Sequence, residues 1–143
     1  ETSIGVDRMV LQVLSAGYQE EKLENGEERT VLSIPAPLAP VKAAVLPLVK
    51  KDGLPEIAHR IKNTLRYDYN IQYDEKDSIG KRYRRQDAIG TPLCITIDHQ
   101  SAEDGTVTVR DRDTMRQERV HIEAIPALVE SKAGMRALLD KLA

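Results

Sequence analysis

Apolar residues in the second part of the chain alternate between short continuous runs and stripes with helical spacing. The first run, Ala43 to Leu46, is unbroken, as in a strand covered on both faces, and Pro47 marks its end. Asp52-Gly53 then turns the chain into a helix with Pro55 at its first position. The apolar stripe of this helix consists of Leu54, Ile57, Ala58, Ile61 and Leu65.

Four further strands are expected, at residues 71–74, 93–98, 106–112 and 117–122. The second of these is nearly all apolar and should lie at the centre of the sheet. Glu103-Asp104-Gly105 is a hairpin turn signal before the third, whose alternation places Arg110 and Arg112 on one face. The last apolar residues predict a C-terminal helix that could bend at Gly134.

The element order β-α-β-α-β-β-β-α predicts an α/β fold, with a five-stranded mixed sheet flanked by helices and right-handed crossovers. Upstream, the first fourteen residues turn from a polar segment into an apolar helix-like run, for which Gly17 is a natural stop. The Glu-rich residues 19–29 predict an exposed turn or mobile loop, followed by a short strand at 30–34. Three prolines between residues 35 and 40 impose an extended connector. We therefore divide the chain into an N-terminal segment 1–17, a linker 18–37 and a compact domain 38–143.

Composition and charge narrow the classes of function. The 143 residues carry a net charge of −2 with a pI near 6.0, so any contact with nucleic acid has to come from a local basic patch. Five Tyr without Phe or Trp argue against a broad base-stacking platform. Cys94 lies in an apolar run and is expected to be buried in a reducing compartment. No run is long enough to span a bilayer and the chain begins without Met, so we expect a cytoplasmic piece of a longer protein.

Motifs for catalysis and metal binding are missing from the sequence. It contains no P-loop, dinucleotide fingerprint, HExxH helix or paired cysteines for zinc. The three histidines, His59, His99 and His121, are scattered and are expected to be ordinary surface residues. No bound metal and no free-standing enzyme is therefore expected.

The most basic stretch lies in residues 78–92, with four cations within five positions: Lys81, Arg82, Arg84 and Arg85. As a short helix that ends near Gly90, this stretch aligns Tyr83 with Ile79 on a core-facing side and turns cations elsewhere. Such a helix is suited to contact phosphates on an α/β scaffold. The alternative is an ordinary solvated face whose cations pair with the neighbouring carboxylates of Asp74, Glu75, Asp77 and Asp87.

A second charged motif, Arg110-Asp111-Arg112-Asp113, ends the alternating strand. It has two interpretations. The first is a structural ladder of ion pairs. The second is base recognition, in which a forked arginine donates to a base edge and a carboxylate accepts from an exocyclic amine. Asp98, at the end of the neighbouring strand, is expected to face the same region.

Three ordered segments resemble one known family. They read LAPVKAAVLPLVKK at residues 38–51, DSIGKRYRRQDAIGTP at 77–92 and DGTVTVRDRDT at 104–114. Together they are similar to the C-terminal anticodon-binding domain of dimeric, class II glycyl-tRNA synthetases, over roughly residues 38–130. The resemblance implies the class IIa anticodon-binding fold and a homodimeric parent enzyme.

The first eight residues, ETSIGVDR, resemble the third class II signature of the catalytic domain, with Thr2 where the glycyl enzymes commonly carry Pro. This resemblance implies that, in the intact enzyme, Arg8 engages the ATP phosphate tail and that Glu1 and Ser3 help hold the glycine amino group. Residues 1–17 would then be a remnant of the catalytic domain. The parent would use ATP and Mg²⁺ to attach glycine. Because the first two class II motifs are missing, we expect no aminoacylation by this chain alone.

The resemblance further implies that the domain holds the anticodon stem-loop of glycine tRNA, and neither a membrane nor DNA is an expected partner. The residues expected to contact the RNA backbone are Lys81, Arg82, Arg84 and Arg85. The residues expected to discriminate bases are Arg110, Asp111, Arg112 and Asp98.

Two other functions fit the same fold. One is a protein-interaction module or accessory subunit, which would have no need of the Arg110 to Asp113 motif. The other is the anticodon domain of a prolyl-, threonyl- or histidyl-tRNA synthetase, against which the GKRYRRQD run at residues 80–87 favours the glycyl enzyme.

Overall fold

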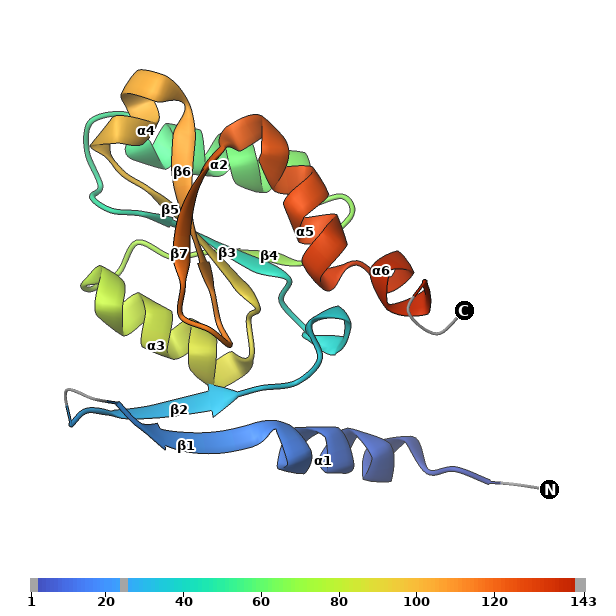
Figure 1. Ribbon diagram of the computed structural model, residues 1–143. Coiled ribbons are helices and arrows are strands. Elements are labelled where there is room, and N and C mark those ends of the chain that lie inside the picture. The colour runs from blue at the N-terminus through green and yellow to red at the C-terminus, as the bar shows by residue number, and fades with distance from the viewer. Residues whose placement is uncertain (1–2, 24–25, 141–143) are drawn as a thin grey trace.

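The computed structural model describes residues 3–23 and 26–140, and Figure 1 shows their arrangement. A five-stranded sheet with the order β4-β3-β5-β6-β7 lies at the centre. Its strands are β3 (Ala43–Pro47), β4 (Ile71–Tyr73), β5 (Leu93–Ile97), β6 (Thr106–Asp111) and β7 (Gln117–His121). β3 pairs in parallel with β4 and β5, whereas β6 is antiparallel to β5 and β7. The predicted α/β fold with a mixed sheet is confirmed, and β5 is the central strand.

Helices cover both faces of this sheet (Figure 1). α2 (Leu54–Leu65) and α5 (Ile125–Ala133) pack on the face that carries Val45, and the apolar stripe predicted for α2 is buried there except for the half-buried Ile57. α3 (Ile79–Ile89) covers the opposite face, which carries Ala44. Because successive strand residues point to opposite faces, both faces of β3 have to be apolar, which explains its unbroken run.

A short helix, α4 (His99–Asp104), occupies the segment where only a hairpin turn is expected. The Asp98 carboxylate accepts a hydrogen bond from the Ser101 backbone N–H at 3.0 Å, and the Ser101 hydroxyl oxygen accepts one from the Asp98 N–H at 3.1 Å. This reciprocal cap starts the helix, and Gly105, with φ of 68°, ends it. The prediction of a turn is therefore correct only for its last residue.

The C-terminal helix is divided, as expected, at Gly134. η2 (Ile122–Ala124) leads into α5, and α6 (Met135–Leu139) follows Gly134, which adopts an extended conformation with φ −71° and ψ 143°. Within the described ranges, no helix has both the length and the apolar character needed to cross a lipid bilayer.

An N-terminal helix and a hairpin precede the sheet domain. α1 (Val6–Gly17) is followed by β1 (Tyr18–Lys22) and β2 (Glu28–Leu32), which pair antiparallel. Of the exposed turn or mobile loop expected at residues 19–29, residues 19–22 and 28–29 instead belong to strands, and the described residues between them form the turn. β2 alternates between exposed positions and the buried Arg29 and Val31, and it packs along α3 (Figure 1).

The segment expected to be a linker, residues 18–37, thus packs against the sheet domain, and a 3-10 turn, η1 (Ala36–Leu38), leads from it into that domain. One contact is especially close. A β-carbon added at Gly90, at the end of α3, would lie 2.9 Å from the backbone oxygen of Leu32 in β2. Gly90 has φ of 82°, so both its backbone conformation and its surroundings favour glycine.

Candidate nucleic-acid interface

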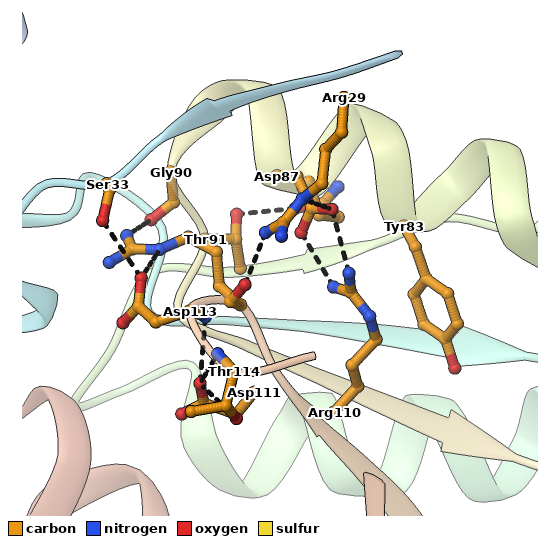
Figure 2. A network of polar contacts seen from close by, with 12 residues as sticks. Arg29, Ser33, Tyr83, Asp87, Gly90, Thr91, Arg110, Asp111, Asp113 and Thr114 are labelled. Carbon is orange, nitrogen blue, oxygen red and sulfur yellow. Dashed lines mark hydrogen bonds and ion pairs between the residues drawn. The ribbon is translucent and has the colours of Figure 1, made fainter. Parts of the chain in front are cut away.

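A buried carboxylate, Asp87 of α3, joins two arginines from distant parts of the chain (Figure 2). Its Oδ1 accepts from Nη1 of Arg110 at 2.8 Å, and its Oδ2 accepts from Nη2 of Arg110 at 3.0 Å and from Nε of Arg29 at 2.9 Å. Asp87 is 0% exposed, Arg29 2% and Arg110 4%. The ion pairs therefore fix β2 and β6 to α3 from inside the protein.

Arg112, just after β6, is equally enclosed. Its guanidinium donates to the backbone oxygens of Gly90 and Ile34, both at 2.8 Å, and to the Asp113 carboxylate at 2.7 Å. Only 2% of the residue is exposed. Arg112 thus holds the chain after the hairpin against the sheet domain. This burial does not favour the expected base recognition by Arg112, because three of its five N–H donors are used inside the protein.

Asp111 also has a structural role in this arrangement. Its Oδ1 accepts from the backbone N–H groups of Asp113 and Thr114 at 2.9 Å each, which closes the turn after β6 (Figure 2). Its Oδ2 pairs with Lys132 of α5 at 2.5 Å. The ladder of alternating ion pairs exists only between Arg112 and Asp113, since Arg110 and Asp111 pair with residues elsewhere.

Two of the four cations of α3 stabilise the fold. Arg82 is 2% exposed and donates to the backbone oxygens of Pro47 at 2.6 Å and Asp74 at 3.2 Å, at the carboxyl ends of β3 and β4. Arg85 is exposed, yet it pairs with Asp74 at 2.6 Å and Asp77 at 2.8 Å. The phosphate contact expected of Arg82 is corrected by its burial, and Arg85 matches the alternative of a solvated ion pair.

The other two cations, Lys81 and Arg84, face a cleft of about 700 Å³. Lys81 is exposed, and Arg84 pairs with Glu27 of the hairpin at 2.9 Å. Residues from α3, the hairpin and the β6–β7 turn line this cleft, which we call the hairpin cleft: Leu23, Glu27, Glu28, Ser78, Gly80, Lys81, Tyr83, Arg84, Arg110, Met115 and Gln117. Arg110 therefore reaches the hairpin cleft despite its burial.

Tyr83 both packs in the core and borders the hairpin cleft. Its ring contacts the apolar cluster under α3, and its hydroxyl forms a 2.7 Å hydrogen bond with the Thr96 hydroxyl. Burial raises the pKa of this hydroxyl. The guanidinium carbon of Arg110 lies 4.9 Å from the ring centroid, a cation–π contact that supplements Asp87 in orienting Arg110 (Figure 2).

Asp98 does not lie beside the Arg110 to Asp113 motif. It follows the carboxyl end of β5, whereas Arg110 pairs with Cys94 near the other end. Its main partner is Arg119 of β7, which donates to both carboxylate oxygens, at 2.7 and 2.9 Å. No pattern in the sequence indicates this pair. This ion pair lowers the pKa of Asp98 to about 2.

Residues of the hairpin cleft on β1–β2 and on the β6–β7 turn were also missed by sequence reasoning, notably Glu27, Glu28, Met115 and Gln117. Met115 has φ of 58°, a left-handed conformation that is unusual for a side chain of its size. The sequence offered no signal for Glu28, because residues 28–30 are all polar and the inward position next to it is the charged Arg29.

Two of the N-terminal residues that the resemblance assigns to the catalytic site lie on the surface. Ser3 and Arg8 are exposed on or beside α1, and Glu1 lies outside the described residues. The described residues contain no group of three His, Cys, Asp or Glu that could hold a metal ion. Cys94 is 1% exposed, and burial raises its thiol pKa to about 12, so it is not a reactive nucleophile.

Comparisons with known proteins find similar sequences among the glycine--tRNA ligases. Glycine--tRNA ligase from Rhodopirellula baltica is 50% identical over 136 residues, which cover 92% of this chain and 25% of that protein. Glycine--tRNA ligase from Geobacillus kaustophilus is 54% identical over 132 residues, with coverages of 92% and 28%. The chain thus spans between a quarter and a third of the length of these relatives.

Two solved structures share the fold. The RNA binding domain of threonyl-tRNA synthetase from Cryptosporidium parvum superposes with a TM-score of 0.62 at 25% identity, covering 70% of this chain and 25% of that one. Prolyl-tRNA synthetase from the same organism gives a TM-score of 0.64 at 19% identity, with coverages of 79% and 30%. The profile of the anticodon binding domain matches residues 42–132, which include the whole five-stranded sheet. The chain therefore belongs to the anticodon-binding domain family of the aminoacyl-tRNA synthetases.

Proposed function

We propose that this chain is the anticodon-binding module of a glycyl-tRNA synthetase and that its hairpin cleft holds the anticodon loop of glycine tRNA. The observation that carries the proposal is the convergence of Lys81, Arg84 and Arg110 on one concave surface beside Tyr83. Cations at the rim of a cleft attract the RNA backbone, and a forked guanidinium inside it can donate to an unstacked base. About 50% identity to glycine--tRNA ligases supports glycine over proline, threonine or histidine as the amino acid.

Within this proposal the cations have separate roles. Lys81 and Arg84 contact phosphates, with Arg84 exchanging its exposed pair with Glu27 for the RNA. Arg110 donates to a base edge. Its two bonds to Asp87 use one N–H of each Nη, which leaves three of its five donors. Arg82, Arg85, Arg112, Asp111 and Asp98 hold the surrounding structure.

The activity of the whole protein is also part of the proposal. The longer parent would be a cytoplasmic homodimer that uses ATP and Mg²⁺ to charge glycine tRNA. Arg8, Glu1 and Ser3 would belong to its catalytic site. This chain by itself would bind RNA without forming glycyl-tRNA, because it spans only 25–30% of the length of the glycine--tRNA ligases that it matches.

The test is the salt dependence of binding to a synthetic anticodon stem-loop of glycine tRNA. Replacing Lys81 and Arg84 by alanine should reduce the slope of log affinity against log salt by about 1–2 units, since each phosphate contact releases a counterion. Replacing Arg60 and Lys62, on α2 across the sheet, removes the same charge and should leave the slope unchanged. Equal slopes for both double variants would contradict the proposed site.

A further inference from the structure

Glu28 is an acidic residue in a cleft that is also lined by three cations. It lies at the start of β2, it is exposed, and it shares the hairpin cleft with Lys81, Arg84 and Arg110. Its neighbour Glu27 is engaged with Arg84. Among the described residues, no hydrogen bond or ion pair involves the Glu28 carboxylate. A site for a polyanion therefore contains an uncommitted negative charge, which is unfavourable unless that charge meets a hydrogen-bond donor of the RNA.

The position of Glu28 is fixed by the residue that follows it. Arg29 is buried and bonds to Asp87 at 2.9 Å and to Glu21 of the paired strand at 3.0 Å. The Asp87 carboxylate also orients Arg110. The backbone that carries Glu28 and the guanidinium of Arg110 are thus held by one buried group. The two side chains enter the hairpin cleft from a preorganised frame, as specific recognition requires.

An ionised carboxylate can only accept hydrogen bonds, so its partner has to be a donor. Cytosine presents an exocyclic amine at N4, and glutamate is suited to accept from it, whereas uracil places a carbonyl oxygen at the same position. Glycine codons begin with two guanines, so the second and third anticodon bases of glycine tRNAs are both cytosine.

We propose that Glu28 is a specificity residue that accepts a hydrogen bond from the N4 amine of one of these two cytosines. This inference rests on the proposed function, since it places the anticodon in the hairpin cleft. Arg110 supplies hydrogen-bond donors, and those not used by Asp87 match the acceptor oxygen and ring nitrogen of cytosine. The carboxylate rejects uracil, whose carbonyl oxygen would face it with lone pairs instead of a proton.

The experiment compares three synthetic glycine anticodon stem-loops: the natural one and two in which the second or the third cytosine is replaced by uridine. Each is titrated against the 143-residue chain, its Glu28→Gln variant and a Glu118→Gln variant. Glu118 is exposed on β7, next to the cleft residue Gln117 but outside the hairpin cleft, so it controls for the loss of one negative charge.

The unmodified chain and Glu118→Gln should prefer the natural loop by about 5- to 150-fold at one of the two positions, the range of a good base contact. Glu28→Gln should lose that preference at the same position to within about twofold and keep any preference at the other. Unchanged ratios, or a loss at both positions, would overturn the role of Glu28. If the natural loop does not bind the unmodified chain, or if replacing Lys81 and Arg84 leaves its binding unchanged, the proposed function fails as well.

Discussion

The buried Asp87 allows the sharpest test of how the hairpin is attached. Replacing it by asparagine should destabilise the protein by about 3–5 kcal/mol, the cost of breaking a buried ion pair from one side. Asp87 accepts three charged hydrogen bonds, one at Oδ1 and two at Oδ2. An asparagine keeps one acceptor oxygen, so at least one arginine N–H meets an amide N–H instead. Arg29 and Arg110 both lose the neutralising charge.

Urea unfolding followed by far-UV circular dichroism measures this loss, because the chain has no tryptophan to report it. A destabilisation of this size lowers the midpoint temperature by roughly 10–20 °C for a chain of this length. The control is Asp77→Asn, which weakens a pair with the exposed Arg85 and should cost far less, because both side chains are solvated. If Asp87→Asn cost no more than the control, the buried network would not be what attaches the hairpin.

Three further outcomes are expected. Gly90→Ala should destabilise by about 2 kcal/mol or more, since it adds a contact with Leu32 to the left-handed strain. Gly53→Ala, with φ of 74° and open space, should cost only about 1 kcal/mol; equal losses would refute the contact. The folded-state pKa of Asp98 lies below its usual value of 3.8, at about 2. Its pair therefore stabilises above pH ~4 and stops contributing as pH falls through ~2. Urea unfolding should accordingly give Asp98→Asn a free energy of unfolding about 1 kcal/mol below that of the unmodified chain at neutral pH, and the two values should converge in acid. Cys94 should resist a thiol reagent until the chain unfolds, and labelling in native buffer at the unfolded rate would contradict its burial.

Much of the fold could be predicted because its main strands and helices bury continuous apolar patterns. β3, β5 and α2 follow directly from apolar runs, a proline and a turn glycine. α4 could not be foreseen, because a six-residue helix has little periodicity and depends on a cap that competes with a turn signal. The hairpin was missed for another reason. Its inward position at residue 29 is an arginine, and hydrophobic patterns do not identify a buried charge.

The candidate site, too, could be predicted only in part from the sequence. The sequence located the basic helix correctly, but it could not tell which cations are free. Arg82 lies one residue from Lys81, yet it points inward to backbone oxygens of β3 and β4. Asp87, the buried partner of Arg110, is 23 positions away in the sequence and was itself interpreted as a surface carboxylate. Only the tertiary arrangement supplies such partners.

The sharing of one carboxylate by two arginines also constrains how this protein can evolve. A change at Asp87 alone leaves the buried Arg29 and Arg110 without a counter-charge. A change at either arginine leaves the Asp87 carboxylate with fewer hydrogen-bond donors. Intermediates between one working combination and another would therefore be poorly folded. Lineages should inherit the trio intact or exchange it as a unit, which would tie the ancestry of the hairpin to that of the sheet beneath it.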